Sequence, residues 1–154
     1  MTSRDILLVL PEITDPLNLG AIVRNAAAFG VGGVLLGPAC RDPLSRQTIR
    51  TSMGTILKLP LARSEDLVAD LGRLRDAGYP SWATVLDDTA DVLGRVAVPD
   101  RLALLLGNEG PGLPAGLVAA CDRRVTVPMR HGTDSLNVAA ASAVFLYELT
   151  RQSV

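Results

Sequence analysis

The sequence predicts a single α/β domain built on a parallel β-sheet. Short apolar segments alternate with longer helical patterns along the chain. These segments are apolar at successive positions, which is typical of strands covered on both faces. With 154 residues, 48% of them hydrophobic, the chain is long enough for one core and short for two. We therefore expect one domain over residues 1–154.

Each expected element follows from a run of apolar residues or from helical spacing. Turn residues bound the apolar runs, which predict about six strands, at residues 6–10, 33–36, 56–61, 82–86, 102–106 and 125–127. Helical patterns lie between most of them, at residues 18–29, 43–53, 64–77, 114–121 and 136–151. Gly30 and Gly78 close the first and third of these helices. The alternation predicts helices on both faces of the sheet.

The last predicted helix is apolar or small on nearly all sides, with the sequence LNVAAASAVFLYEL. A helix on a protein surface would show a polar half. One explanation is a central helix of the core. The other is that Ala139, Ala140, Ala141 and Ala143 admit a second backbone at close range, as a threaded segment or a subunit interface requires. Periodicity leaves both explanations open.

Charge and cysteine content exclude several classes of protein. The net charge is −1, so contact with nucleic acid requires a local basic patch. Cys40 and Cys121 are far apart and His131 is the single histidine, which argues against a zinc site and a disulfide framework. The apolar runs are too short for a secretion signal or a membrane span. We expect a cytoplasmic protein without metal or membrane contact.

A glycine-rich loop follows the strand predicted at 102–106, in the sequence ALLLGNEGPGLP. A Walker loop would need a lysine after its last glycine, and the one lysine of the chain is Lys58 in another segment. A dinucleotide-binding turn has the order G-x-G-x-x-G after the first strand, whereas Gly107, Gly110 and Gly112 follow G-x-x-G-x-G. The loop is either a tight turn before Pro114 or a backbone surface against a flat ligand.

Two further segments complete a family pattern. DPLNLGAIVRNAAAFGV covers residues 15–31, and VTVPMRHGTDSLNVAAASAVFLYEL covers residues 125–149. Together with the glycine-rich loop they resemble the three signature motifs of the SpoU/TrmH family of RNA ribose 2′-O-methyltransferases, in the SPOUT superfamily. TSMGTILKLP, at 51–60, is similar to the family's intervening S-x-G segment. The resemblance spans essentially the whole chain.

The resemblance implies a fold, a cofactor and partners. It implies the SPOUT fold, in which the C-terminal segment forms a deep trefoil knot. S-adenosyl-L-methionine is the implied cofactor, RNA (tRNA or rRNA) is the implied substrate, and a homodimer through the C-terminal helix is implied. Many relatives carry an extra N-terminal RNA-recognition domain, so the chain either acts alone or is the C-terminal catalytic domain of a longer protein.

The resemblance also implies roles for individual residues. The implied catalytic residues are Arg24, Asn18, Ser135 and Asn137. The implied cofactor-binding residues are Thr84, Leu106, Gly107, Val127, Met129, Ser135 and Leu136, with Glu109 and Asn108 in support. Arginine is not deprotonated in proteins, because its pKa lies above about 12. We therefore expect Arg24 to clamp an RNA phosphate and to stabilise the developing alkoxide, rather than to act as a base.

Arg41, Arg46 and Arg50 cluster after the second predicted strand and form a candidate RNA-binding patch, in addition to Arg24. Arg46 and Arg50 are one helical turn apart and so share a face. The alternative is a solvated helix face balanced by Asp42. Phosphate contacts by such a patch would offset the acidic balance of the chain.

Other interpretations of these motifs stay open. Asn18 stands where a helix N-cap is expected, as do Asp134 and Ser135 before the last helix. His131, Asp134 and Ser135 suggest a hydrolase triad, but they lie within five positions and lack the G-x-S-x-G elbow. A catalytically silent RNA- or cofactor-binding module is the remaining alternative.

Overall fold

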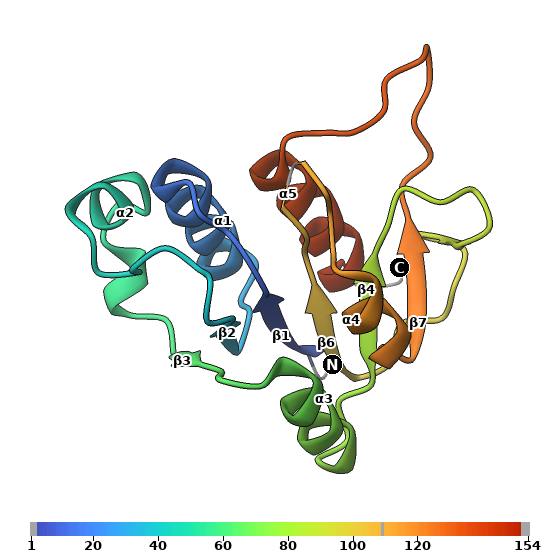
Figure 1. The fold of residues 1–154 in the computed structure, drawn as a ribbon, viewed down its shortest axis with the longest axis horizontal. Coiled ribbons are helices and arrows are strands. Elements are labelled where there is room, and N and C mark those ends of the chain that lie inside the picture. Colours follow the sequence, from blue (N-terminus) through green and yellow to red (C-terminus); the bar gives the residue numbers. More distant parts are fainter. Residues whose placement is uncertain (1–2, 109, 152–154) are drawn as a thin grey trace.

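The computed structural model describes residues 3–108 and 110–151 as a parallel β-sheet flanked by helices (Figure 1). In chain order the elements are β1 (Asp5–Leu10), α1 (Pro16–Ala28), β2 (Gly33–Leu36), α2 (Arg46–Thr51), the 3-10 helix η1 (Thr55–Leu57), β3 (Leu61–Arg63), α3 (Leu67–Asp76), β4 (Ser81–Thr84), β5 (Asp91–Val92), β6 (Arg101–Leu105), α4 (Ala115–Ala120), β7 (Arg123–Thr126) and α5 (Val138–Thr150). The described strands form one seven-stranded sheet in the order β3-β2-β1-β6-β4-β7-β5, and every pairing is parallel. The parallel sheet is confirmed, and the strand count is seven rather than about six.

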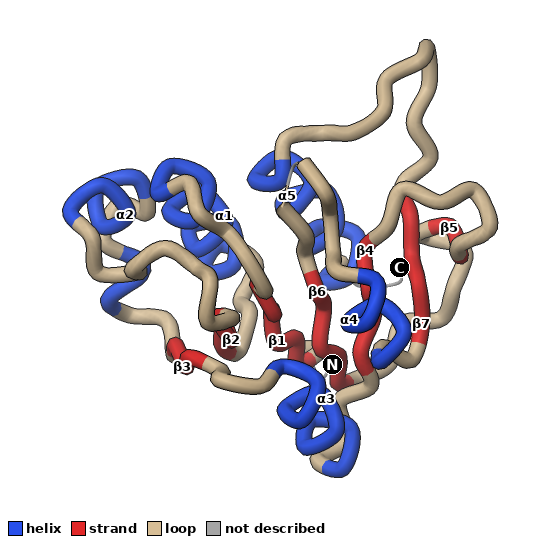
Figure 2. Tube along the Cα trace, in the orientation of Figure 1, coloured by secondary structure: helices blue, strands red, loops and turns tan. Residues whose placement is uncertain are grey.

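Helices cover both faces of the sheet, and the layers can be followed in Figure 2. Alternate residues of each strand point to opposite faces. Leu8 and Leu104 belong to the larger cluster, which also contains residues of α1 and α5. Val9 and Leu105 belong to a smaller cluster with Leu71 of α3 and residues of α4. This arrangement explains why the strand sequences are apolar without alternation.

The strand predicted at 56–61 is wrong for most of its length. Met53 and Gly54 adopt left-handed backbone conformations, with φ of 56° and 75°, directly after α2. The chain then forms η1, in which Leu57 N donates to Gly54 O at 3.1 Å. Strand β3 begins only at Leu61, because the apolar residues before it are placed by this turn rather than by the sheet.

The N-terminal caps of α1 and α5 differ from the expected ones. Asp15, not Asn18, caps α1, since its side chain accepts from Leu17 N. Asn137 caps α5, so neither Asp134 nor Ser135 does so. Both caps accept from backbone amides of the first helical turn, which is the usual way to satisfy these donors.

The connections around β7 distinguish this sheet from a simple alternating fold. Residues 85–100 connect β4 to β6 and include β5, which pairs with β7. Strand β7 therefore lies between β4 and β5. Figure 1 shows the segment after β7 extending away from the sheet before it returns to α5.

Within the described part of the chain, the helices lack the length and apolarity needed to cross a membrane.

Candidate functional site

A cavity of about 760 Å³ opens at the carboxyl ends of β4, β6 and β7. Its lining includes every residue that the sequence implied for cofactor binding, namely Thr84, Leu106, Gly107, Val127, Met129, Ser135 and Leu136. These residues come from three segments far apart in the sequence. The volume lies within the range of small-molecule sites in proteins, and most of the lining side chains are apolar.

The glycine-rich loop folds back on itself at the wall of this cavity. Gly112 N donates to Asn108 O at 3.1 Å, which closes the loop, and Gly112 has a φ of 70°. A Cβ added to Gly107 would lie 2.7 Å from the backbone of Gly112 and of Leu113. Glycine is therefore required at 107 by close backbone approach. Asn108 lines the cavity, whereas Glu109 lies outside the described residues.

The loop after β4 forms another wall and is tied to β7. Thr84 Oγ1 donates to Leu105 O at 2.9 Å, which fixes the start of the loop. Asp87 forms an ion pair with Arg124 of β7, and its carboxylate accepts from the amide and hydroxyl of Thr89. The hydrogen bonds from Thr89, with that from Arg124, lower the pKa of Asp87. The loop thus carries a charged carboxylate at the cavity edge at neutral pH.

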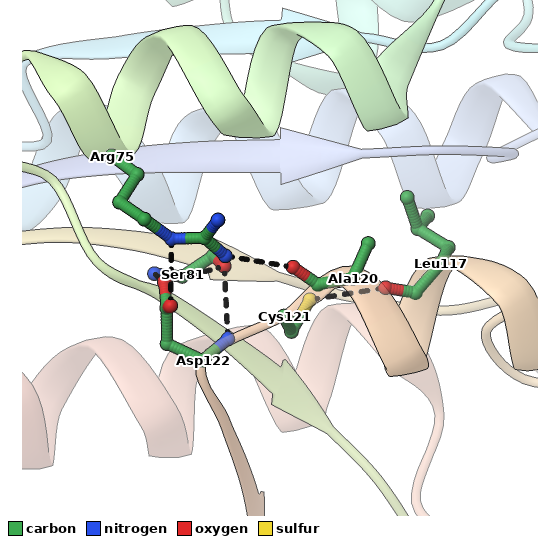
Figure 3. A network of polar contacts seen from close by, with 6 residues as sticks. All are labelled: Arg75, Ser81, Leu117, Ala120, Cys121 and Asp122. Atoms are coloured by element: carbon green, nitrogen blue, oxygen red, sulfur yellow. Dashed lines mark hydrogen bonds and ion pairs between the residues drawn. The ribbon is translucent and has the colours of Figure 1, made fainter.

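Asp122, which lines the cavity, joins α3, β4 and the α4–β7 connection (Figure 3). Its Oδ2 accepts from the Ser81 amide at 2.7 Å, and its Oδ1 accepts from Arg75 Nε at 2.8 Å. Cys121 lines the cavity, and its thiol donates to Leu117 O at 3.3 Å. Burial raises the pKa of the Cys121 thiol, so it stays protonated and unreactive at neutral pH.

Two asparagines of α1 hold this helix against α5. Asn137 Nδ2 donates to Asn18 Oδ1 at 3.1 Å. Asn25 Nδ2 donates to Ala139 O at 3.0 Å and to Ser142 Oγ at 2.9 Å. Asn18 and Asn25 are seven positions apart and therefore lie on the same face of α1. Sequence reasoning missed Asn25, for which this spacing was the available signal.

Arg24 is not among the residues that line the cavity. Its side chain is exposed on α1, and it forms no hydrogen bond or ion pair with any other described residue. Ser135 lines the cavity, while Asn18 of the first motif and Asn137 of the third are hydrogen-bonded to each other. The structure thus brings three of the four implied catalytic residues to the α1–α5 junction and the loop before it.

The candidate RNA-binding arginines lie on one exposed segment of the chain. Arg41 is in the β2–α2 connection, and Arg46 and Arg50 are in α2. Asp42 accepts from the Leu44 amide at 2.9 Å instead of pairing with them. Considering the described residues, none of these arginines has an ion-pair partner. Their charge is available to an external polyanion.

The described residues form neither a hydrolase triad nor a metal site. His131, Asp134 and Ser135 are all exposed, and no hydrogen bond joins them in the described residues. A group of three or more His, Cys, Asp or Glu side chains that could hold a metal ion is likewise absent from residues 3–108 and 110–151.

Comparison with known proteins decides the family. The model of the SpoU rRNA methylase family matches residues 5–147. The chain belongs to the SpoU family. An uncharacterized tRNA/rRNA methyltransferase of Mycobacterium tuberculosis is 44% identical over 146 residues, which cover 93% of this chain and 51% of that protein. The SpoU chain thus spans about half the length of this curated relative.

Solved structures of the same family share the fold. An RNA methyltransferase described as of the TrmH family, from Porphyromonas gingivalis, has a TM-score of 0.89 at 31% identity, over 98% of this chain and 61% of that one. An AdoMet-bound rRNA methyltransferase from Sinorhizobium meliloti has a TM-score of 0.85 at 32% identity, over 96% and 56%. A structure described as an RNA 2′-O ribose methyltransferase has a TM-score of 0.84 at 30% identity, over 96% and 56%.

Proposed function

We propose that this SpoU-family chain is a catalytic domain that methylates a ribose 2′-hydroxyl in structured RNA, either tRNA or rRNA, with S-adenosyl-L-methionine as methyl donor. One observation carries the proposal: three distant segments converge on a single cavity that contains every residue implied for cofactor binding. The AdoMet-bound structure from Sinorhizobium meliloti supports the cofactor, and the 2′-O ribose methyltransferase supports the acceptor. We place the activity in the cytoplasm.

The cavity residues suit a nucleoside joined to a sulfonium. When bound, the cofactor supplies a methyl group made electrophilic by the positive sulfur. The Leu106 and Gly107 backbone lines one wall at close range, because Gly107 has no Cβ. Val127, Met129 and Leu136 supply apolar contacts to the flat base. Asn108 supports the loop beside Glu109.

In our proposal the acceptor hydroxyl is held by Ser135 and by residues of the α1–α5 junction. Methyl transfer is an in-line displacement, so holding the oxygen in line with the methyl group supplies much of the rate. Ser135 orients the hydroxyl from the cavity side, and the Asn18–Asn137 pair fixes the loop that carries it. Arg24 clamps a neighbouring phosphate and stabilises the developing alkoxide.

We further propose how the chain contacts RNA, how two chains associate and how the C-terminal segment is threaded. Arg41, Arg46 and Arg50 track the RNA backbone. Two chains associate through α5, where Val144 and Tyr147 are 41% and 60% exposed despite being apolar. A second cavity, of about 510 Å³, is lined by both residues and supports such a contact surface. The enclosure of β7 between β4 and β5 supports a C-terminal trefoil knot.

Two measurements test the function. Titration calorimetry with S-adenosyl-L-methionine should show one saturable site per chain, and tritiated cofactor should label tRNA or rRNA. Digestion of that RNA should yield 2′-O-methylated nucleosides. Binding without transfer to any RNA would establish the silent module instead. Label on a base rather than a ribose would refute the 2′-O assignment.

A further inference from the structure

The segment 37–45 between β2 and α2 is contacted along its backbone by one arginine side chain. Arg63 ends the edge strand β3, beside this segment. Its Nη1 donates to the carbonyl oxygens of Gly37 at 3.1 Å, Cys40 at 3.3 Å and Pro38 at 3.4 Å, and its Nη2 reaches that of Arg41 at 3.5 Å. A single planar guanidinium therefore gathers four carbonyl groups of one turn.

The opposite side of the segment is fixed to the β1–α1 loop. Gly37 N donates to Leu10 O at 2.8 Å, and a Cβ at Gly37 would lie 2.1 Å from Pro11 O. The Cys40 thiol, which is buried, donates to Leu10 O at 2.9 Å and accepts from Ile13 N at 3.3 Å. Arg63 thus binds the carbonyl groups of a turn that is already hydrogen-bonded to Leu10 at the end of β1.

This arrangement places Arg41 against the loop that leads to α1. Arg41 N donates to Ile13 O at 2.8 Å, while its own side chain is exposed. The loop that it touches continues to Asp15, the cap of the helix that bears Asn18 and Arg24. The backbone contacts therefore fix the position of the Arg41 main chain, from which its side chain extends, relative to the proposed reaction site.

We propose that Arg63 is a positioning residue for RNA binding: it holds segment 37–45 in the shape that presents Arg41 to an RNA phosphate. The inference rests on the proposed function. Its physical basis is preorganisation, since a loop that is already ordered loses less conformational entropy when it binds. Both terminal nitrogens of Arg63 donate to protein carbonyls, so in this proposal Arg63 acts through the loop and Arg41 makes the phosphate contact.

A cycle of variants tests whether Arg63 acts through Arg41. Arg63→Gln should raise the KM for RNA about fivefold, through loss of preorganisation, and leave kcat and the Kd for S-adenosyl-L-methionine unchanged. In an Arg41→Ala background, Arg63→Gln should change KM less than about twofold, because residues that act as a unit are not additive. Arg73→Ala, which removes the same charge from α3, should leave KM at the wild-type value.

The Arg63→Lys variant separates position from charge. Lysine keeps the charge but lacks the planar pair of donors, so its KM should follow Arg63→Gln. A wild-type KM in Arg63→Lys, or multiplying effects of Arg63→Gln and Arg41→Ala, would show that Arg63 contacts RNA itself and would overturn the inference. Hydrogen exchange of the Gly37 and Arg41 amides should be faster in Arg63→Gln than in wild type.

The outcomes also separate this inference from the function on which it rests. If the wild-type chain neither binds nor methylates RNA, the proposed function fails. If it does both while Arg63→Gln leaves the KM for RNA and the exchange of segment 37–45 unchanged, only the role of Arg63 fails.

Discussion

Asn137 donates from its Nδ2 to the Oδ1 of Asn18 at 3.1 Å, although 119 positions separate the two residues in the sequence. The Oδ1 of Asn137 also accepts from the amides of Ala139 and Ala140, so one side chain both caps α5 and connects it to α1. Ser135, which lines the cavity, lies two positions before Asn137. The pair therefore fixes the first turn of α1 relative to the loop at the cavity.

Substitution of Asn18 tests whether this hydrogen bond serves turnover. Asn18→Leu removes the acceptor at similar volume and leaves the cap of α5 in place. We expect kcat to fall about tenfold through misplacement of the acceptor loop, with an unchanged Kd for S-adenosyl-L-methionine. Asn18→Asp keeps an acceptor oxygen and should retain most of the activity. Equal loss in both variants would mean that the Asn18 amide is needed for another contact.

Arg24→Ala should separate cofactor binding from turnover. The side chain is exposed and lies outside the cavity lining, so calorimetry should give the wild-type Kd for S-adenosyl-L-methionine. Loss of a charge that stabilises the alkoxide should lower kcat by about a hundredfold or more. Arg95→Ala, another exposed arginine, is the matched control and should keep its activity. A parallel loss of binding and turnover in Arg24→Ala would instead mark a structural residue.

The local sequence pattern predicted the strands that have long apolar runs. It failed for very short strands and for contacts between residues that are distant in the sequence. Strand β6 follows from the uninterrupted run that ends at Leu106. Strand β5 has only Asp91 and Val92, which is too short for any periodicity to reveal. The contact of Asn25 with Ser142 joins helices 117 positions apart, and no local pattern encodes such a partner. The cavity lining comes from the glycine-rich loop, the segment after β7 and the β4 end at Thr84, and only the family resemblance joined these segments before the structure did.

Gly107→Ala should impair the cavity more than the fold. The new Cβ would lie 2.7 Å from the backbone of Gly112 and Leu113, both of which line the cavity. We expect displacement of this loop to raise the Kd for S-adenosyl-L-methionine at least about tenfold, which corresponds to about 1.4 kcal/mol. Gly116→Ala, in α4, meets nothing within 4 Å and should bind normally. An unchanged Kd in Gly107→Ala would remove the glycine-rich loop from the cofactor site.

Two helical glycines should respond to alanine in opposite directions. A Cβ at Gly20 would lie 2.6 Å from Thr51 Cβ and 2.9 Å from Thr48 O, so α2 must move away from α1. Overpacking of this kind costs about 1–3 kcal/mol, despite the better helix propensity of alanine. Gly72 in α3 has nothing within 4 Å of that position, and Gly72→Ala should stabilise by about 0.5–1 kcal/mol. Urea unfolding measures both, and a stabilised Gly20→Ala would contradict the close approach.

Asp122 should make stability depend on pH in the acid range. Partial burial raises the pKa of Asp122, but hydrogen bonds from the Ser81 amide and Arg75 outweigh it, so the pKa is lowered on balance. A folded pKa below the unfolded value of about 3.9 gives stability that is present above that pH and is lost as the pH falls further.

The variant Asp122→Asn isolates this contribution, because its amide does not titrate. At neutral pH it should lower the free energy of unfolding by about 1–2 kcal/mol, since a charged acceptor is lost from the Ser81 and Arg75 contacts. Between about pH 5 and pH 3 the wild type should lose more stability than the variant, so that the two urea-unfolding curves converge. Asp88→Asn, at an exposed carboxylate, should follow the wild type throughout. Curves for wild type and Asp122→Asn that stay parallel down to about pH 3 would show that this carboxylate has the same pKa in the folded and unfolded chain.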